Sequence, residues 1–537
     1  MTTLSAAPLR DPRTSRSRTA TDGADAVGRW LRIACLVACA IGIGAALTFY
    51  AHRGSLWEDE LIAITHANQP LPSFFVEMLR NDIHPPLWFL QLDGWLALGP
   101  ATDGWALANS LLWAAISLAT MFAVARTLHG VRAAWIATAL LAVLPNFAWS
   151  AGTLRMYAAI PACVLFVYFA NRRWFDTRRP GWLVACLVAE VAVAYVHAVE
   201  FYFVAFIVAG ALIEAAAAGN LRLPSAHFRR SVRMWLVVQV VVGACLLPLA
   251  ASALLRGSDA SAPDSAVAML SIGGGLVVGW KTSSIAWLRY CATVVFVLLV
   301  GCALADRGSR WRTLVVPIGA LLVAVALALL VKPIYKQPVF SANLLPFVVL
   351  GAAAAAARFR GALAVVAACI VVLAIAAFPL TSRQAQAEAY AGAARSVQQR
   401  AVAGDVVVVP NVSVFWGIAR YAIGPQWGRP LAVMSPPNAQ WAGLNARIAA
   451  RWGAEAPKHL GLVPETHVVD HDGVRYVLGS DAIDDTAGAR HVWVVTRERY
   501  QVDVRLAPAF RPSEVVAPEV FGDGELMVRR FDRSDVP

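Results

Sequence analysis

The sequence predicts a polytopic α-helical membrane protein of about 11 transmembrane helices, followed by a C-terminal extracytoplasmic α/β domain. The chain has 537 residues, of which 58% are hydrophobic and 15% charged, whereas a soluble protein has about 25% charged residues. Apolar runs of membrane-spanning length recur up to Leu380, and short valine-rich runs replace them beyond it. The apolar runs cover residues 30–50, 105–125, 133–149, 156–170, 182–199, 201–218, 234–254, 285–305, 314–331, 339–357 and 361–380.

The distribution of arginine predicts the topology. Arginines gather in alternate connections between the apolar runs, and basic residues stay on the cytoplasmic side of a membrane. This places the N-terminus in the cytoplasm and the first connection, 51–104, outside, together with the C-terminal region. The apolar stretch 85–98 would invert the later alternation if it crossed the membrane. We therefore expect a helix in the outer interface, with Trp88 and Trp95 at headgroup level.

This topology divides the chain into three parts. Residues 1–28, rich in arginine, serine and threonine, are expected to form a disordered cytoplasmic tail. Residues 29–380 form the transmembrane part. Residues 381–537 form the extracytoplasmic α/β domain, in which 381–400 is expected to be helical. Its predicted strands are Gly404–Pro410, Arg490–Thr496 and Glu525–Phe531.

The composition also argues against several classes of function and of site. The net charge is +12, but the basic residues lie in short loops where topology uses them, so no nucleic-acid partner is expected. All eight cysteines fall inside apolar runs, without the spacing of a metal site or a disulfide framework.

The first outer loop carries the strongest candidates for chemistry, the adjacent acids Asp59 and Glu60. Ionisable residues at a membrane are costly and are usually functional. On a helix the two side chains point about 100° apart, so one can act as a general base while the other orients it or holds a cation. The alternative is a solvated loop acid or a helix cap.

His84 follows in the same loop, directly before Pro85 and Pro86. The prolines stiffen the backbone, and the second can begin a helix. A histidine held there can donate to a phosphate, bind a metal or carry a proton. The alternative is a histidine that serves only the turn.

Further candidates lie in other outer loops. Arg155 stands in the short second outer loop, where its guanidinium suits phosphate or simply reaches the interface. His197 and Glu200, three residues apart, are expected to share a helix face. The outer-loop lysines can bind an anion or anchor the protein at the interface. These lysines are Lys281, Lys332 and Lys336.

The order of these motifs resembles the GT-C superfamily of integral membrane glycosyltransferases. The nearer branch includes protein O-mannosyltransferases, the lipid A aminoarabinose transferase and lipopolysaccharide-core transferases. The motifs that carry the resemblance are Trp57–Glu60, His84–Leu87, Leu154–Tyr157 and Ala194–His197. Two positions depart from the pattern: Thr153 replaces an acid, and Ser341–Asn343 replaces an Arg-Tyr pair before Leu344.

The resemblance implies a GT-C-like fold and transfer of a hexose or pentose from a polyprenyl-phosphate-linked donor. The acceptor would be a cell-envelope lipid or glycan, in preference to a protein, at the outer face of a bacterial inner membrane. Asp59 would be the base and Glu60 its support. Arg155 and the three lysines would hold the donor phosphate. His84, Tyr157 and His197 would complete the substrate site.

No cofactor is firmly implied, and a divalent cation, if required, would be held by Asp59 and Glu60. Two other functions remain open from the residues: a transporter or flippase of a lipid-linked or anionic solute, and a non-catalytic membrane scaffold. Transporters usually show internal repeats and broken spans near the midplane. Neither is expected here, because no repeat is visible and the polar residues gather at one face of the membrane.

Overall fold

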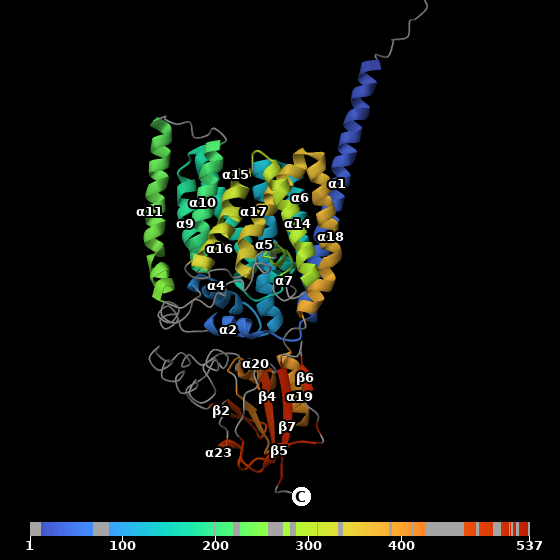
Figure 1. Ribbon diagram of the computed structural model, residues 1–537, viewed down its shortest axis with the longest axis vertical. Helices are drawn as coiled ribbons and strands as arrows, with labels where there is room; N and C mark the ends of the chain where they lie inside the picture. The colour runs from blue at the N-terminus through green and yellow to red at the C-terminus, as the bar shows by residue number, and fades with distance from the viewer. Residues whose placement is uncertain are drawn as a thin grey trace, which may run out of the picture.

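The computed structural model describes residues 12–67, 85–197, 199–217, 226–255, 272–279, 286–308, 310–330, 337–385, 389–410, 412–424, 467–478, 483–497, 506–514, 516, 519–521 and 526–534. A bundle of helices makes up most of the molecule, and a sheet domain lies at one end of it (Figure 1). The N-terminal end of α1 points away from the opposite end of the bundle. The first apolar run therefore begins on the side away from the sheet domain.

The bundle follows the predicted apolar runs. Seven described helical segments are long and apolar enough to cross a membrane, and one bent helix pair could form an eighth crossing. The other three predicted runs fall on α8, α9 and α10. The bundle helices are α1 (Pro12–His52), α5 (Asp103–His129), α6 (Val131–Val143), α7 (Pro145–Ala151), α8 (Ile160–Thr177), α9 (Gly181–Val196), α10 (Glu200–Ala217), α11 (Ala226–Leu255), α13 (Ile272–Val278), α14 (Ala286–Ala305), α15 (Arg310–Thr313), the π-helix Leu314–Gly319, α16 (Ala320–Leu330), α17 (Gln337–Arg358) and α18 (Arg360–Ala385).

The expectation of unbroken spans is wrong at the third predicted run, 133–149. Its two helices, α6 and α7, meet at an angle of 72°. The residue before a proline avoids the helical conformation, and Leu144 is indeed extended before Pro145, which begins α7. The break places α7 across the end of the bundle that faces the sheet domain (Figure 1). The loop that follows α7, which contains Arg155, therefore begins at this end.

Two short helices cover the same end of the bundle. They are α2 (Glu58–Ala67) and α4 (Pro86–Leu96). With 11 residues α4 is too short to span a membrane. The expectation that Trp88 lies among lipid headgroups is wrong, because its side chain is only 1% exposed and packs in the protein core. Trp95 is partly buried and stacks on Trp105 with ring centroids 4.3 Å apart.

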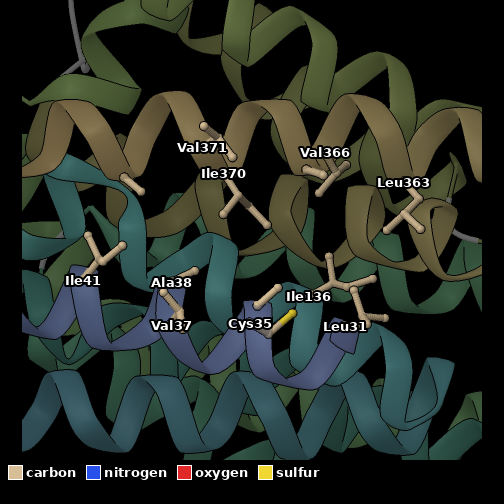
Figure 2. Close-up of a pocket in the computed structure, with 13 residues that line it drawn as sticks. Leu31, Cys35, Val37, Ala38, Ile41, Ile136, Leu363, Val366, Ile370 and Val371 are labelled. Atoms are coloured by element: carbon tan, nitrogen blue, oxygen red, sulfur yellow. The ribbon is translucent and has the colours of Figure 1, made fainter. Parts of the chain in front are cut away.

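An apolar groove of about 320 Å³ lies between α1, α6 and α18 (Figure 2). Leu31, Ile136 and Ile370 are among the aliphatic side chains that line it. The groove offers apolar contact and no charged side chain, so acid–base chemistry has to be sought at the end of the bundle.

The sheet domain is α/β. Its seven strands have the order β2-β3-β1-β4-β7-β5, and β6 also pairs with β7. The central strand β1 is parallel to both β3 and β4, and the other pairs are antiparallel. The strands are β1 (Val406–Val409), β2 (His467–His471), β3 (Val474–Leu478), β4 (His491–Arg497), β5 (Phe510–Pro512), β6 (Glu519–Phe521) and β7 (Leu526–Arg533), and the domain's helices are α19 (Tyr390–Arg400), α20 (Val412–Ala422) and α23 (Ile483–Thr486).

The three predicted strands match β1, β4 and β7. Buried valines favour β1 and β4, whereas β7 has the single valine Val528 among its buried apolar residues. The predicted helix 381–400 is divided between the end of α18 and α19. The β2–β3 hairpin was not predicted. Its turn places Asp472 and Gly473 at positive φ, as a two-residue hairpin requires.

We predict that Gly42→Ala destabilises the bundle. A methyl group at Gly42 of α1 would overlap the carbonyl oxygen of Ala142 on α6, and backbone cannot yield as a flexible side chain can. Gly243→Ala on α11 is the matched control, since a methyl group there meets open space and alanine favours helix. Thermal unfolding in detergent should show a lower midpoint only for Gly42→Ala, and equal midpoints would contradict the close α1–α6 contact.

Candidate functional site

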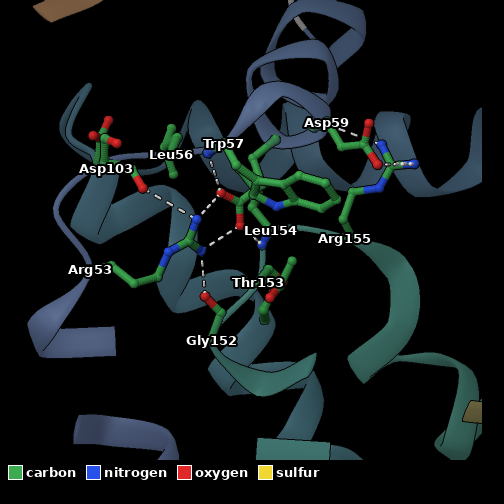
Figure 3. Close-up of polar contacts among 12 residues, drawn as sticks. Arg53, Leu56, Trp57, Asp59, Asp103, Gly152, Thr153, Leu154 and Arg155 are labelled. Carbon is green, nitrogen blue, oxygen red and sulfur yellow. Dashed lines mark hydrogen bonds and ion pairs between the residues drawn. The ribbon is translucent and has the colours of Figure 1, made fainter. Parts of the chain in front are cut away.

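A cluster of charged side chains lies where three segments meet at the sheet-domain end of the bundle (Figure 3). The segments are the end of α1 with the turn after it, the first turn of α2, and the loop that follows α7. They contribute Arg53, the acids Asp59 and Glu60, and Arg155.

Glu60 is the centre of this cluster. Its side chain is 0% exposed and forms an ion pair with Arg53, which is 6% exposed. Both carboxylate oxygens accept hydrogen bonds from the Arg53 guanidinium. The backbone N–H of Trp57 also donates to Glu60 at 2.9 Å, and that of Leu154 donates at 2.6 Å. One buried carboxylate therefore joins all three segments.

The local sequence explains this geometry. Glu60 is the third residue of α2, and its carboxylate reaches back to the N–H of Trp57, which precedes the helix. This is the glutamate half of a capping box. Arg53 also donates to the carbonyl of Gly152 at 2.7 Å. A side chain at Gly152 would overlap the ring of Phe49, so the loop can approach α1 this closely only as glycine.

Asp59 has a different environment from its neighbour. Its side chain is 38% exposed, and Oδ2 lies 3.8 Å from Nη2 of the buried Arg155. Arg155 also donates to the backbone carbonyl of Asp59 at 3.1 Å. The separation of the side chains exceeds that of a direct hydrogen bond, so the carboxylate can still accept a proton from a bound molecule. Figure 3 shows Asp59 and Arg155 facing each other, apart from Arg53.

A divalent cation held jointly by Asp59 and Glu60 does not fit this arrangement. Both Glu60 oxygens face the Arg53 guanidinium, and a cation would have to displace that charge. The residues that the structure describes contain no group of three or more metal-ligating side chains. No chemical step is therefore assigned to a metal ion.

Other predicted residues lie in different settings. Tyr157 is 7% exposed, lies beside Arg155 and stacks on Trp149. His197 is buried at the end of α9 in an extended conformation, where its Nδ1 accepts the N–H of Val199. The expectation that His197 and Glu200 share a helix face is wrong, because a break separates α9 from α10.

Asn343, one of the positions at which the sequence departs from the GT-C motif pattern, is hydrogen-bonded to Glu200 in the structure. The Asn343 amide donates to Glu200 at 2.7 Å, and both side chains are 0% exposed. Four of the predicted binding residues lie outside the described residues, and their roles stay predictions. These are His84, Lys281, Lys332 and Lys336.

Sequence reasoning missed the residues that hold the site together. Arg53 falls in the predicted outer connection 51–104 and is not among the predicted site residues, although it stands just after a span and seven residues before Glu60. Asp103 was read as part of the loop, yet it begins α5 and contacts Arg420 and Tyr421 of the sheet domain. The pairing of Arg53 with Glu60 could have been predicted from their spacing in the sequence, whereas no neighbouring residue indicates the contacts of Asp103.

No protein-family model and no curated protein matches the chain. Solved structures do. ArnT from Cupriavidus metallidurans in the apo state is 14% identical with a TM-score of 0.53, over 94% of this chain and 98% of ArnT. ArnT bound to undecaprenyl phosphate is 13% identical with a TM-score of 0.52, over 92% and 97%. Mycobacterial arabinofuranosyltransferase AftD aligns with a TM-score of only 0.42, over 94% of this chain and 40% of AftD.

The alignment with ArnT extends over nearly the whole of both chains, including the sheet domain. At this identity it shows the fold alone. The chain shares the fold of ArnT, in agreement with the GT-C-like fold that the motif order implied.

We predict that the two adjacent acids differ in their effect on stability. Glu60→Gln leaves the buried Arg53 without its counter-charge, which should cost about 3 kcal/mol or more. Asp59→Asn changes a partly exposed carboxylate and should leave stability nearly unchanged. Thermal unfolding of both variants in lipid nanodiscs compares them directly, and an equal loss for the two would contradict the structural role of Glu60.

Proposed function

We propose that the protein is a glycosyltransferase that uses a polyprenyl-phosphate-linked sugar and a hydroxyl acceptor. One observation carries the proposal: the half-exposed carboxylate of Asp59 faces the buried guanidinium of Arg155 at the end of the bundle. The shared fold with ArnT, which was solved with undecaprenyl phosphate, supports a lipid-linked phosphate as the ligand class.

The two side chains suit the two halves of such a reaction. Asp59 takes the proton from the acceptor hydroxyl as its oxygen attacks the anomeric carbon. The bond between that carbon and the phosphate oxygen breaks, and polyprenyl phosphate leaves with the electron pair. Arg155 meets the developing phosphate charge from a buried position, where a fixed cation acts more strongly than in water. Attack opposite the leaving group inverts the sugar carbon.

Glu60 is a positioning residue in this proposal. Its four hydrogen bonds hold the first turn of α2 against the Leu154–Arg155 loop. Tyr157 packs beside Arg155 and is assigned to the same substrate site. His84, His197 and the three outer-loop lysines are retained as further substrate contacts on the strength of the motif resemblance.

The proposed setting is a bacterial inner membrane, with the N-terminus cytoplasmic and the sheet domain, residues 381–537, extracytoplasmic. The alternation of arginines supports this orientation. The acceptor class is a cell-envelope lipid or glycan, lipopolysaccharide included. Such an acceptor would reach Asp59 from the extracytoplasmic side.

We predict that Asp59→Asn lowers transfer by about 1,000-fold, the contribution of a general base. The full-length protein in nanodiscs would be given labelled polyprenyl-phosphate sugars and a lipid extract, and release of polyprenyl phosphate would be measured. Asp93→Asn is the control, because Asp93 is an exposed acid on α4. Full activity of Asp59→Asn would remove the base assignment. If the wild-type protein releases polyprenyl phosphate from none of the donors, the proposed function is overturned, and a transporter or a scaffold is favoured.

We further predict that Arg155→Lys raises the KM for the donor about tenfold. Lysine keeps the charge and loses the planar, two-pronged contact with phosphate, and a hydrogen bond to a charged group is worth about 1.5–3 kcal/mol. Arg126→Lys, at an exposed arginine near the other end of α5, serves as control. Initial rates at varied donor concentration measure the effect, and an unchanged KM would rule out phosphate binding by Arg155.

A further inference from the structure

The sheet domain contacts the segment that precedes Asp59. The hydroxyl of Tyr421, on α20, accepts the backbone N–H of Leu56 at 2.7 Å and donates to Asp103 at 2.5 Å. The neighbouring Arg420 donates to the other oxygen of Asp103 from Nε at 2.9 Å and from Nη2 at 2.5 Å. Asp103 is the first residue of α5, so α20 bridges the bundle and the turn that leads into α2.

A second contact holds the same turn. The backbone N–H of Tyr390, the first residue of α19, donates to the hydroxyl of Ser55 at 3.1 Å. Tyr390 is itself fixed, since it is 0% exposed and packs directly on Gly417 of α20. Ser55 and Leu56 are thus both hydrogen-bonded to the sheet domain, three to four residues before Asp59.

The turn is also hydrogen-bonded to the first residues of α2. The carbonyl of Trp57, the residue after Leu56, accepts the backbone N–H groups of Glu60 and Leu61 at 3.0 Å each. Its own N–H donates to the Glu60 carboxylate. The first turn of α2 is therefore built on Trp57, whose position depends on Leu56. The path from Tyr421 therefore runs through Leu56 and Trp57 to the first turn of α2, which contains Asp59.

We propose that the sheet domain is part of the catalytic apparatus, and that Tyr421 is a positioning residue that aims Asp59 through Leu56 and Trp57. This inference rests on the proposed function and deepens it, because it assigns a task to a domain that supplies neither Asp59 nor Arg155. The domain fixes the first turn of α2, and without that contact the Asp59 carboxylate samples orientations that do not reach the acceptor hydroxyl.

The chemistry of Tyr421 suits this task. Burial, together with the Asp103 carboxylate, raises the pKa of the hydroxyl well above its ordinary value, so the group stays protonated and keeps donating to Asp103. Its oxygen remains available to the Leu56 N–H. The Arg420–Asp103 ion pair supplies a separate attachment of the domain. Removing one hydroxyl therefore loosens the turn while the domain stays attached.

The test is Tyr421→Phe in the full-length protein in nanodiscs. Residue-resolved hydrogen exchange by mass spectrometry should show faster exchange at the amides of Glu60 and Leu61, which donate to the carbonyl of Trp57 and not to Tyr421. The kcat for polyprenyl-phosphate release should fall about tenfold or more, since small misplacement of a catalytic group costs that much. The donor KM should stay within about twofold, because Arg155 is unaffected.

Tyr476→Phe, on β3, is the matched control, because it removes a buried tyrosine hydroxyl within the sheet. It should leave exchange at Glu60 and Leu61 unchanged. Ser55→Ala is a second variant that removes the acceptor of the Tyr390 N–H without altering the domain. It should act in the same direction as Tyr421→Phe, and it decides the question if that variant fails to fold.

The outcomes separate the two proposals. Unchanged exchange at Glu60 and Leu61 in folded Tyr421→Phe overturns the inference, and so does faster exchange with unchanged kcat. If wild type releases no polyprenyl phosphate from any donor, the proposed function fails. The role of Tyr421 in positioning Asp59 for the reaction then fails with it, whereas the exchange result still shows whether the sheet domain orders the turn.

Discussion

The ion pair between Glu60 and Arg53 is the interaction on which the end of the bundle depends. Both side chains are almost fully buried, and a buried charge is tolerated only when it is paired and hydrogen-bonded. Here the pairing also determines geometry, because Glu60 accepts hydrogen bonds from the turn after α1, from the residue before α2 and from the loop after α7. The loop after α7 is about a hundred residues from the other two segments in the chain, and the requirement to satisfy one carboxylate brings them together.

The same constraint gives two neighbouring acids different tasks. Adjacent residues on a helix point about 100° apart, so when Glu60 turns inward to Arg53, Asp59 is left at the surface beside Arg155. One carboxylate is saturated with donors and supports the structure, while the other keeps the capacity to accept a proton. A metal ion would need both acids to face one point, and the geometry of the helix opposes that. The replacement of an acid by Thr153 in the neighbouring loop agrees with a site that relies on a single available carboxylate.

The sequence predicted much of the fold, because membrane spans and buried strands have strong local signals. Apolar length located the bundle helices, and short apolar runs bounded by turn residues located β1, β4 and β7. The motif resemblance assigned Asp59 and Arg155 to one substrate site, and their side chains lie 3.8 Å apart. The bend is indicated by Pro145 and the hairpin by the Asp472–Gly473 pair, so both could have been predicted from the sequence. The contacts of Asp103 with Arg420 and Tyr421 had none, because they join residues more than 300 positions apart and depend on how the sheet domain is placed.

Two kinds of constraint therefore meet at Asp59. The bundle supplies electrostatics: a buried guanidinium at Arg155 and a neutralised pair at Glu60. The sheet domain supplies orientation, through hydrogen bonds to two consecutive residues of the turn before α2. Neither constraint alone fixes a side chain at the N-terminus of a short helix, since a helix of 10 residues has little stability of its own. Asp59 on such a helix gains its fixed direction from tertiary contacts on both sides, with Arg155 of the bundle and, through the turn before α2, with the sheet domain.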